Sequence, residues 1–110
     1  MSDRWQEIIN AARRIDKKYQ ALDEERLGRK WSNTEFLAAT ATDWGELVEK
    51  IMIFDKLRDG EAKKQEIAHE LSDLLWALIV LSDRLEIKLD EAFLNTINEL
   101  EVRLKDLPGE

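Results

Sequence analysis

The sequence predicts an all-α protein organised as a four-helix bundle, and three observations favour this fold class. Only four glycines and one proline interrupt 110 residues, so few positions break regular structure. Apolar residues recur at intervals of three or four, the period of a helix, and no segment alternates with the period of a strand. The length suits one domain, so residues 1–110 are expected to fold as a single unit.

The first helix is expected to start near Ser2 or Asp3 and to end before Gly28. Its apolar residues recur every three or four positions and form one stripe: Trp5, Ile8, Ala12, Ile15, Tyr19 and Leu22. This pattern predicts an amphipathic helix that places one face against a core.

The second helix follows a short basic linker. Ser32 and Glu35 have the S-x-x-E spacing of a capping box, in which each side chain accepts a backbone N–H of the other residue. The Asp59-Gly60 pair is a strong turn signal beyond the end of this helix. Gly45, in mid-helix, costs about 1 kcal/mol relative to alanine, which favours a close crossing with another helix at this point.

The third helix is expected over about residues 61–85, and a fourth starts near Asp90 and ends before Pro108. The fourth helix carries apolar residues at helical spacing: Phe93, Ile97, Leu100 and Leu104. In the third helix, the run from Leu74 to Leu81 is apolar on all sides and must be covered all round. Because one small subunit cannot cover it, a symmetric homo-oligomer is expected.

The composition excludes several kinds of function. The chain has 24 acidic and 17 basic residues, which gives a net charge of −7. This negative charge argues against a nucleic-acid polymer as partner. The absence of cysteine and the single histidine exclude disulfides, thiolate catalysis and zinc sites built from Cys or several His. Because the longest apolar run is too short for a bilayer and the N-terminus has no signal core, a cytoplasmic protein without a membrane partner is expected.

Acidic residues form two stripes, one on the second helix and one on the third. The first contains Asp43, Glu46 and Glu49, and the second contains Glu66, Glu70 and Asp73. Within each stripe the spacing of three or four places the carboxylates on one side of the helix. In an antiparallel hairpin centred on the Asp59-Gly60 turn, Asp43 and Glu46 lie level with Glu70 and Asp73, and Glu49 lies level with Glu66.

Facing carboxylates repel one another, so the two stripes require raised pKa values or a bound cation. Mg²⁺ prefers oxygen ligands and is commonly held by carboxylates together with substrate phosphates. The sequence therefore predicts a Mg²⁺ site, with Mn²⁺ as the alternative ion. The other interpretation is that these acids form solvated helix faces in a strongly acidic protein.

Two segments carry a resemblance to a known family. Residues 43–49, DWGELVE, and residues 70–73, ELSD, resemble the E-E-x-x-E and E-x-x-D signature of the MazG-like nucleoside triphosphate pyrophosphohydrolases, which are all-α proteins related to dimeric dUTPases and dCTP pyrophosphatases. The similarity covers about residues 30–105. It implies that Asp43, Glu46, Glu70 and Asp73 hold Mg²⁺, and that a nucleoside triphosphate is cleaved between its α- and β-phosphates into a nucleoside monophosphate and pyrophosphate.

The same resemblance implies a housekeeping enzyme of the nucleotide pool that assembles as a homodimer or homotetramer. In such an assembly, a neighbouring subunit can contribute residues that complete the active site. Thr42 stands where the signature has its first Glu, and Thr96 and Leu100 stand where family members often carry a phosphate-binding Lys and Asn. Arg103 matches a basic position and is the candidate phosphate contact on the last helix. These departures leave open a family member whose activity is lost or altered.

Glu49, with Glu66 opposite it, is the candidate for orienting or deprotonating the attacking water. The alternative for Glu49 is a surface contact with Lys50 or Lys63. Either role requires the two acidic stripes to face each other.

Trp31 is the candidate substrate-binding residue, because an aromatic face can stack on any nucleobase. Trp44 and Trp76 are considered for the same wall, although core packing is the alternative for Trp76 in its apolar run. Base and sugar preference depend on the shape of the pocket walls, which the sequence does not define.

A helical interaction module is the alternative function from a different class. In that interpretation the acids are a solvated face and the apolar run is an interface with a partner. Composition and periodicity fit both functions, but only the enzyme requires Asp43 and Glu46 to face Glu70 and Asp73.

Overall fold

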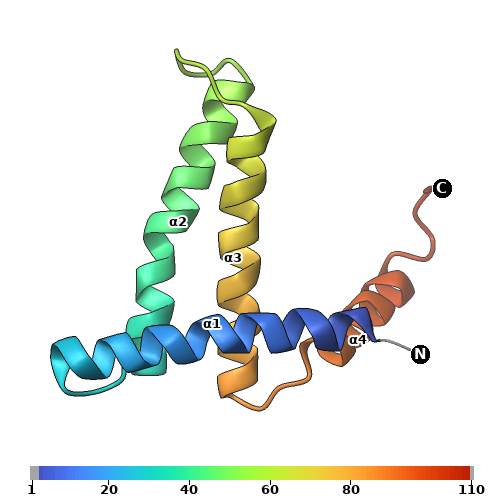
Figure 1. Cartoon of the computed structure of the whole chain (residues 1–110). Helices are drawn as coiled ribbons and strands as arrows, with labels where there is room; N and C mark the ends of the chain where they lie inside the picture. Colours follow the sequence, from blue (N-terminus) through green and yellow to red (C-terminus); the bar gives the residue numbers. More distant parts are fainter. Residues whose placement is uncertain (1–2, 110) are drawn as a thin grey trace.

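The chain folds into four helices joined by short connections (Figure 1). The computed structural model describes residues 3–109, and within this range the helices are α1 (Arg4–Leu27), α2 (Asn33–Phe54), α3 (Lys64–Arg84) and α4 (Leu89–Arg103). No strand occurs among the described residues, so the predicted all-α class is confirmed. None of these helices has the combination of length and apolar character needed to cross a membrane.

Local chemistry sets both ends of α1. The Asp3 side chain caps the start by accepting the backbone N–H groups of Trp5 and Gln6. Gly28 ends the helix with a φ of 74°, in the left-handed region that glycine adopts without a steric cost. The predicted ends are therefore confirmed at Asp3 and Gly28, and Ser2 lies outside the described residues.

The predicted capping box begins α2. The Glu35 backbone N–H donates to Ser32 Oγ at 3.1 Å, and the Ser32 backbone N–H donates to Glu35 Oε1 at 3.0 Å. Arg29 adds a two-point contact, with Nη1 and Nη2 at 2.7 and 2.9 Å from the two Glu35 oxygens. The Arg29 contact and the Ser32 backbone N–H lower the pKa of Glu35 from its ordinary 4.5 to about 2.

The helices α2 and α3 run antiparallel and side by side, joined at one end of the molecule by residues 55–63 (Figure 1). Gly60 has a φ of 136° in this connection, which favours glycine over any residue with a side chain. The predicted hairpin with its Asp59-Gly60 turn is thus confirmed. Its geometry decides which side chains of α2 and α3 meet.

The core lies where α1 crosses α3, away from the hairpin turn (Figure 1). Its buried members are Ala12, Phe36, Ala77, Ile79 and Val80. Trp76 packs against them and donates its indole N–H to the Ala12 carbonyl at 3.3 Å. The predicted apolar stripe of α1 is only partly buried in this core, because Ile8, Ile15 and Tyr19 are exposed.

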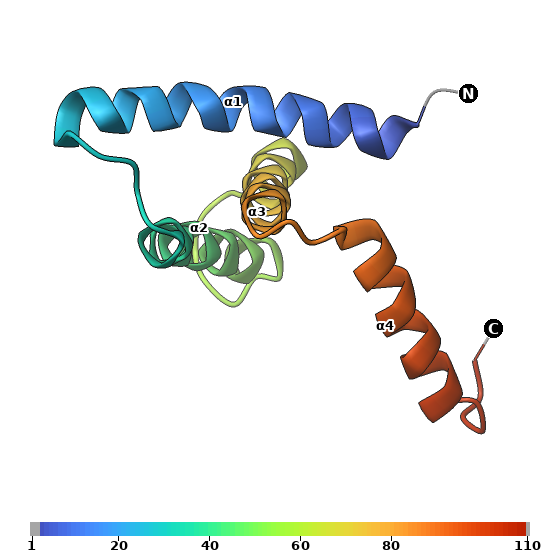
Figure 2. The same cartoon turned by 90° about the horizontal axis from the view of Figure 1, so that it is seen from below.

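The fourth helix points away from the α2–α3 hairpin (Figure 2). The radius of gyration is 17.6 Å, against about 13 Å for a compact domain of about this length. Phe93 and Leu94 on α4 are 58% and 60% exposed. Together with Trp5, Leu75 and Leu78 they line an open apolar hollow between α4 and the rest of the chain.

A Cβ at Gly45 would have no side chain and no atom of another helix within 4 Å. The close helix crossing expected at Gly45 is therefore wrong for a single chain. We expect Gly45→Ala to raise the free energy of unfolding by about 0.5–1 kcal/mol, because alanine loses less backbone entropy in a helix. Thermal unfolding measures this as a higher midpoint, whereas Gly28→Ala should lower it because of the positive φ. A lower midpoint for Gly45→Ala would mean that another chain packs against Gly45.

The Arg29–Glu35 contact predicts a pH-dependent contribution to stability. Since the pKa of Glu35 falls from 4.5 to about 2 on folding, its contribution is complete above pH 4.5 and is lost as the pH falls toward 2. We expect Glu35→Gln to melt below the unsubstituted protein at pH 7, and the difference to shrink steadily below pH 4.5. Melting curves at pH 7, 4 and 3 test this, and a difference that does not change with pH would contradict it.

Candidate active site

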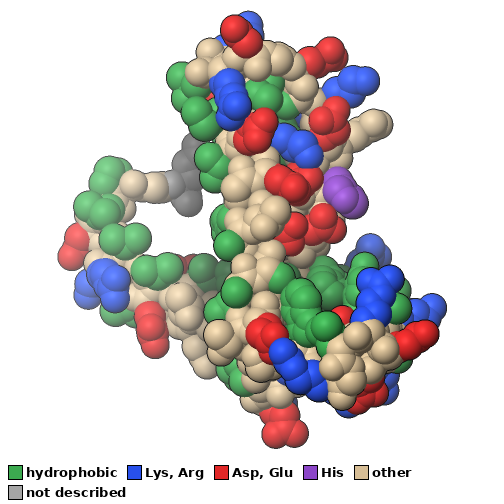
Figure 3. All heavy atoms as spheres, turned by 90° about the vertical axis from the view of Figure 1, so that its left-hand side faces the viewer, with side chains coloured by type: hydrophobic (Ala, Val, Ile, Leu, Met, Phe, Trp, Pro, Cys, Tyr) green, Lys and Arg blue, Asp and Glu red, His purple; other side chains and the backbone are tan. Residues whose placement is uncertain are grey.

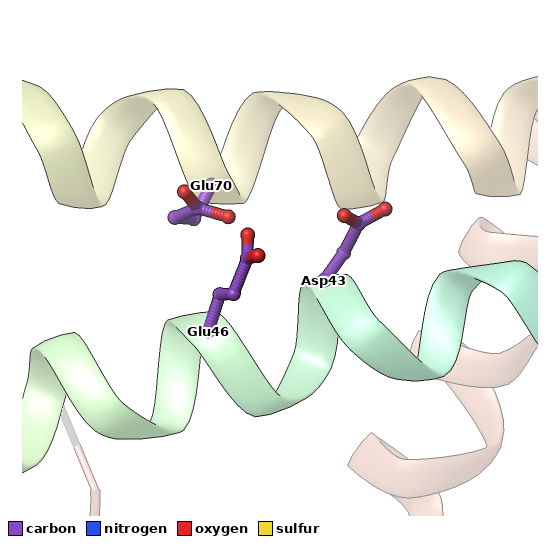
Figure 4. Close-up of side chains that lie close together, drawn as sticks. All are labelled: Asp43, Glu46 and Glu70. Atoms are coloured by element: carbon purple, nitrogen blue, oxygen red, sulfur yellow. The ribbon is translucent and has the colours of Figure 1, made fainter.

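The hairpin brings three of the predicted carboxylates together (Figure 4). Asp43 and Glu46 project from α2 toward α3, and Glu70 projects from α3 into the same space. One carboxylate oxygen of each residue lies within 4.8 Å of the others. We call these three residues the acidic group. Their convergence follows from helical spacing on both sides of the turn, as predicted.

The remaining members of the two acidic stripes lie beside the acidic group. Asp73 is one turn further along α3, where its Oδ2 lies 3.3 Å from His69 Nε2, and it shares an open hollow with Asp43. Glu49 is exposed, with its Oε1 4.0 Å from Arg58 Nη1, and Glu66 is also exposed. Figure 3 shows acidic side chains gathered next to the histidine on this face. The roles predicted for Asp73, Glu49 and Glu66 remain predictions.

Glu70 is the buried member of the acidic group, with 4% of its surface exposed. Its Oε1 accepts a hydrogen bond from Lys50 Nζ at 2.6 Å, while its Oε2 is buried and has no hydrogen-bond partner. The Lys50 hydrogen bond lowers the pKa of Glu70, although burial acts in the opposite direction. Glu70 is therefore an ionised carboxylate whose second oxygen lacks a partner, which is the condition that a bound cation relieves.

Lys50 also belongs to the site, although the sequence indicates it only as a surface contact of Glu49. Its ammonium is half-buried, and its pKa is raised by the hydrogen bond to Glu70 and also by the charges of Glu66 and Glu46. The signal was present in the spacing, because Lys50 follows Glu46 by one helical turn on the same side of α2.

A pocket of about 210 Å³ lies between α1, α2 and α3, next to the acidic group. Four aromatic side chains line it, and we call it the aromatic pocket: Tyr19, Trp31, Phe36 and Trp76. The Trp76 ring lies 5.8 Å from Tyr19 and 5.7 Å from Phe36, measured between centroids. Asp43 lines this pocket and also belongs to the acidic group, so the two features adjoin. Trp44 lies elsewhere, on a small apolar pocket with Leu37 and Leu78.

A buried ion pair lines the aromatic pocket. Arg84 Nη2 donates to Asp16 Oδ1 at 2.7 Å, Gln20 Nε2 donates to Asp16 Oδ2 at 2.6 Å, and the Arg84 guanidinium lies 4.5 Å from the centre of the Phe36 ring. The sequence interpretation missed Asp16 and Arg84. For Arg84 a signal exists, because it continues the buried face of α3 at helical spacing: Glu70, Leu74, Ala77 and Val80.

The comparisons with known proteins identify one family for the chain. A family model described as the MazG nucleotide pyrophosphohydrolase domain matches residues 32–107. The chain belongs to the MazG family. No curated protein and no solved structure matched it significantly. The matched range of this MazG domain contains the whole acidic group, whereas α1 with Asp16 and Tyr19 precedes it.

Two positions that the resemblance connects with the site do not join the acidic group in the structure. Thr42, which the sequence resemblance places at the first signature position, is exposed on α2. Arg103 lies in the last turn of α4, which points away from the hairpin, so a single chain does not bring Arg103 to the acidic group (Figure 2). Its predicted contact with substrate remains a prediction that needs another arrangement of α4 or a second chain.

The Asp16–Arg84 pair predicts a large loss of stability when one partner is removed. Arg84→Met leaves a buried carboxylate whose remaining described partner is Gln20, so we expect a loss of about 3 kcal/mol in the free energy of unfolding. The double variant Asp16→Leu/Arg84→Met removes both charges and should recover most of this loss. Urea unfolding at one fixed protein concentration measures both values. Equal losses in the single and double variants would contradict the explanation.

Proposed function

We propose that residues 1–110 form a single domain, of which residues 32–107 match the MazG family, and that it is a Mg²⁺-dependent nucleoside triphosphate pyrophosphohydrolase. It cleaves between the α- and β-phosphates and releases a nucleoside monophosphate and pyrophosphate. The observation that carries the proposal is the shared position of Asp43, which belongs to the acidic group and also lines the aromatic pocket. A base and a polyphosphate chain need such adjoining apolar and cation-binding surfaces.

The residues of the acidic group fit a hard divalent ion. Asp43, Glu46 and Glu70 supply oxygen ligands, and Asp73 is the proposed fourth ligand from the adjoining turn of α3. Mg²⁺, or Mn²⁺ as the alternative, suits this donor set better than zinc, which favours His and Cys ligands. A Mg²⁺ ion bound here would neutralise phosphate charge and lower the pKa of a coordinated water.

The aromatic pocket supports the proposed position of the base. Trp31 and Tyr19 offer ring faces at its walls, and Trp76 connects these walls to the core. Stacking on aromatic rings accepts any base, so selectivity must come from polar groups nearby. Asp16 and Arg84 line this pocket and are hydrogen-bonded to each other. This bond holds the polar side chains of the pocket in place before a ligand binds.

Glu49 and Glu66 remain the proposed residues for orienting or deprotonating the attacking water. Both lie toward the hairpin turn from the acidic group and both are exposed, so water reaches them freely. A general base must come within hydrogen-bond reach of the water it activates. Glu66 lies on α3 one helical turn before Glu70, and its charge acts on Lys50, so it adjoins the acidic group on the side of the hairpin turn.

The proposed enzyme assembles as a homodimer or homotetramer. Exposed apolar side chains on α3 and α4, among them Leu75, Leu78 and Phe93, supply a surface that a second copy can cover. Assembly also offers a route by which Arg103 of one copy reaches the phosphates bound by another.

The reaction is tested by measuring pyrophosphate release from a panel of ribonucleoside and deoxyribonucleoside triphosphates with Mg²⁺. We expect turnover of at least one substrate, and a loss of about 100-fold or more in Glu70→Gln, since a ligand that stabilises transition-state charge is removed. Glu25→Gln removes an exposed acid on α1 and serves as the matched control, with unchanged turnover expected. No pyrophosphate release from any substrate of the panel, or equal turnover in Glu70→Gln, would contradict the proposed function.

A further inference from the structure

Lys50 places a positive charge inside the acidic group. Its Nζ lies 2.6 Å from Glu70 Oε1, and the charges of Glu66 and Glu46 also act on it. The ammonium therefore interacts with two of the three carboxylates that are proposed to bind the divalent ion. No other lysine or arginine in the described part of the chain has an ion pair with Asp43, Glu46 or Glu70.

The ammonium and a divalent ion are poorly compatible at Glu70. Mg–O bonds are about 2.1 Å long, so an ion on Oε1 of Glu70 would come close to the ammonium that lies 2.6 Å from that oxygen, and an ion on Oε2 would share the same carboxylate with it. Like charges at such a separation repel strongly in a partly buried site. The free Oε2 lies on the buried side of the same carboxylate and has no competing partner.

We propose that Lys50 is a built-in competitor of the divalent ion, whose ammonium holds Glu70 while no ion is bound and leaves Glu70 when the ion binds. This inference rests on the metal site of the proposed function. The movement required is small, because Glu66 lies one helical turn from Glu70 on α3 and already acts on the same ammonium. Lys50 thereby compensates the buried carboxylate in the metal-free protein and lowers the affinity for the ion.

The test measures binding of Mn²⁺ alone, by isothermal titration calorimetry, to the whole chain. Lys50→Met and Lys50→Gln remove the competing charge, and Lys50→Arg keeps it. Lys64→Met is the matched control, because it removes one positive charge from the same helix pair without a described contact to the acidic group. Glu70→Gln removes the contested ligand.

We expect Lys50→Met and Lys50→Gln to bind Mn²⁺ about tenfold more tightly. This factor corresponds to the loss of one charge-assisted hydrogen bond, between Lys50 and Glu70, from the metal-free state. Lys50→Arg and Lys64→Met should stay close to the unsubstituted protein. The rise in the thermal midpoint that Mn²⁺ causes should likewise be larger in Lys50→Met, because tighter binding to the folded state raises it further. This second readout does not depend on turnover.

Unchanged or weaker Mn²⁺ binding in both neutral variants would overturn the competitor role, because Lys50 would then only position Glu70. Tighter binding in Lys64→Met by the same factor would overturn it too, since the effect would be one of net charge. The proposed metal site itself fails if the unsubstituted protein and all Lys50 variants bind Mn²⁺ no better than Glu70→Gln. A failed competitor is thus distinguishable from a failed site.

Discussion

The burial of one ionised carboxylate, Glu70, is the constraint on which the rest of the site depends. A buried charge must be paired, and in this fold the available partners come from α2, where Lys50 donates to one oxygen and leaves the other free. The same packing of α2 against α3 places Asp43 and Glu46 beside Glu70. The Lys50 ammonium is the cation that compensates Glu70 in the structure, and a divalent ion is the proposed alternative.

One face of α3 connects this centre to the aromatic pocket. It begins at Glu70, continues through the apolar core, and ends at Arg84, which pairs with Asp16 of α1. Trp76 lies between the two ends and bonds to the backbone of α1. The position of α1, and with it the wall formed by Tyr19, is thus set by the same helix that carries the buried carboxylate. Substitutions in the core are expected to affect both features together.

Features that depend on residues near one another in the sequence were predicted correctly. The caps at Asp3 and Ser32, and the acidic spacing on each side of the Asp59-Gly60 turn, follow from local chemistry and helical rise.

Features that depend on distant residues were not predicted. The Asp16–Arg84 pair joins positions 68 apart on two helices whose crossing the sequence does not define. Lys50 lies within the predicted hairpin, but helical spacing does not define which partner its long side chain reaches, so its ion pair with Glu70 was not predicted. Apolar periodicity also could not show which side of α1 faces the core, because Asp16 occupies that side.

The most direct test of the central claim is the location of bound Mn²⁺, mapped by the paramagnetic broadening of backbone amide signals in the NMR spectrum. We expect broadening to centre on residues 43–46 and on Glu70, and a non-hydrolysable nucleotide analogue then to perturb the signals of Trp31 and Trp76 next to them. Broadening spread evenly over the acidic surface, or centred on another acidic stretch such as Asp23–Glu25, would contradict the account.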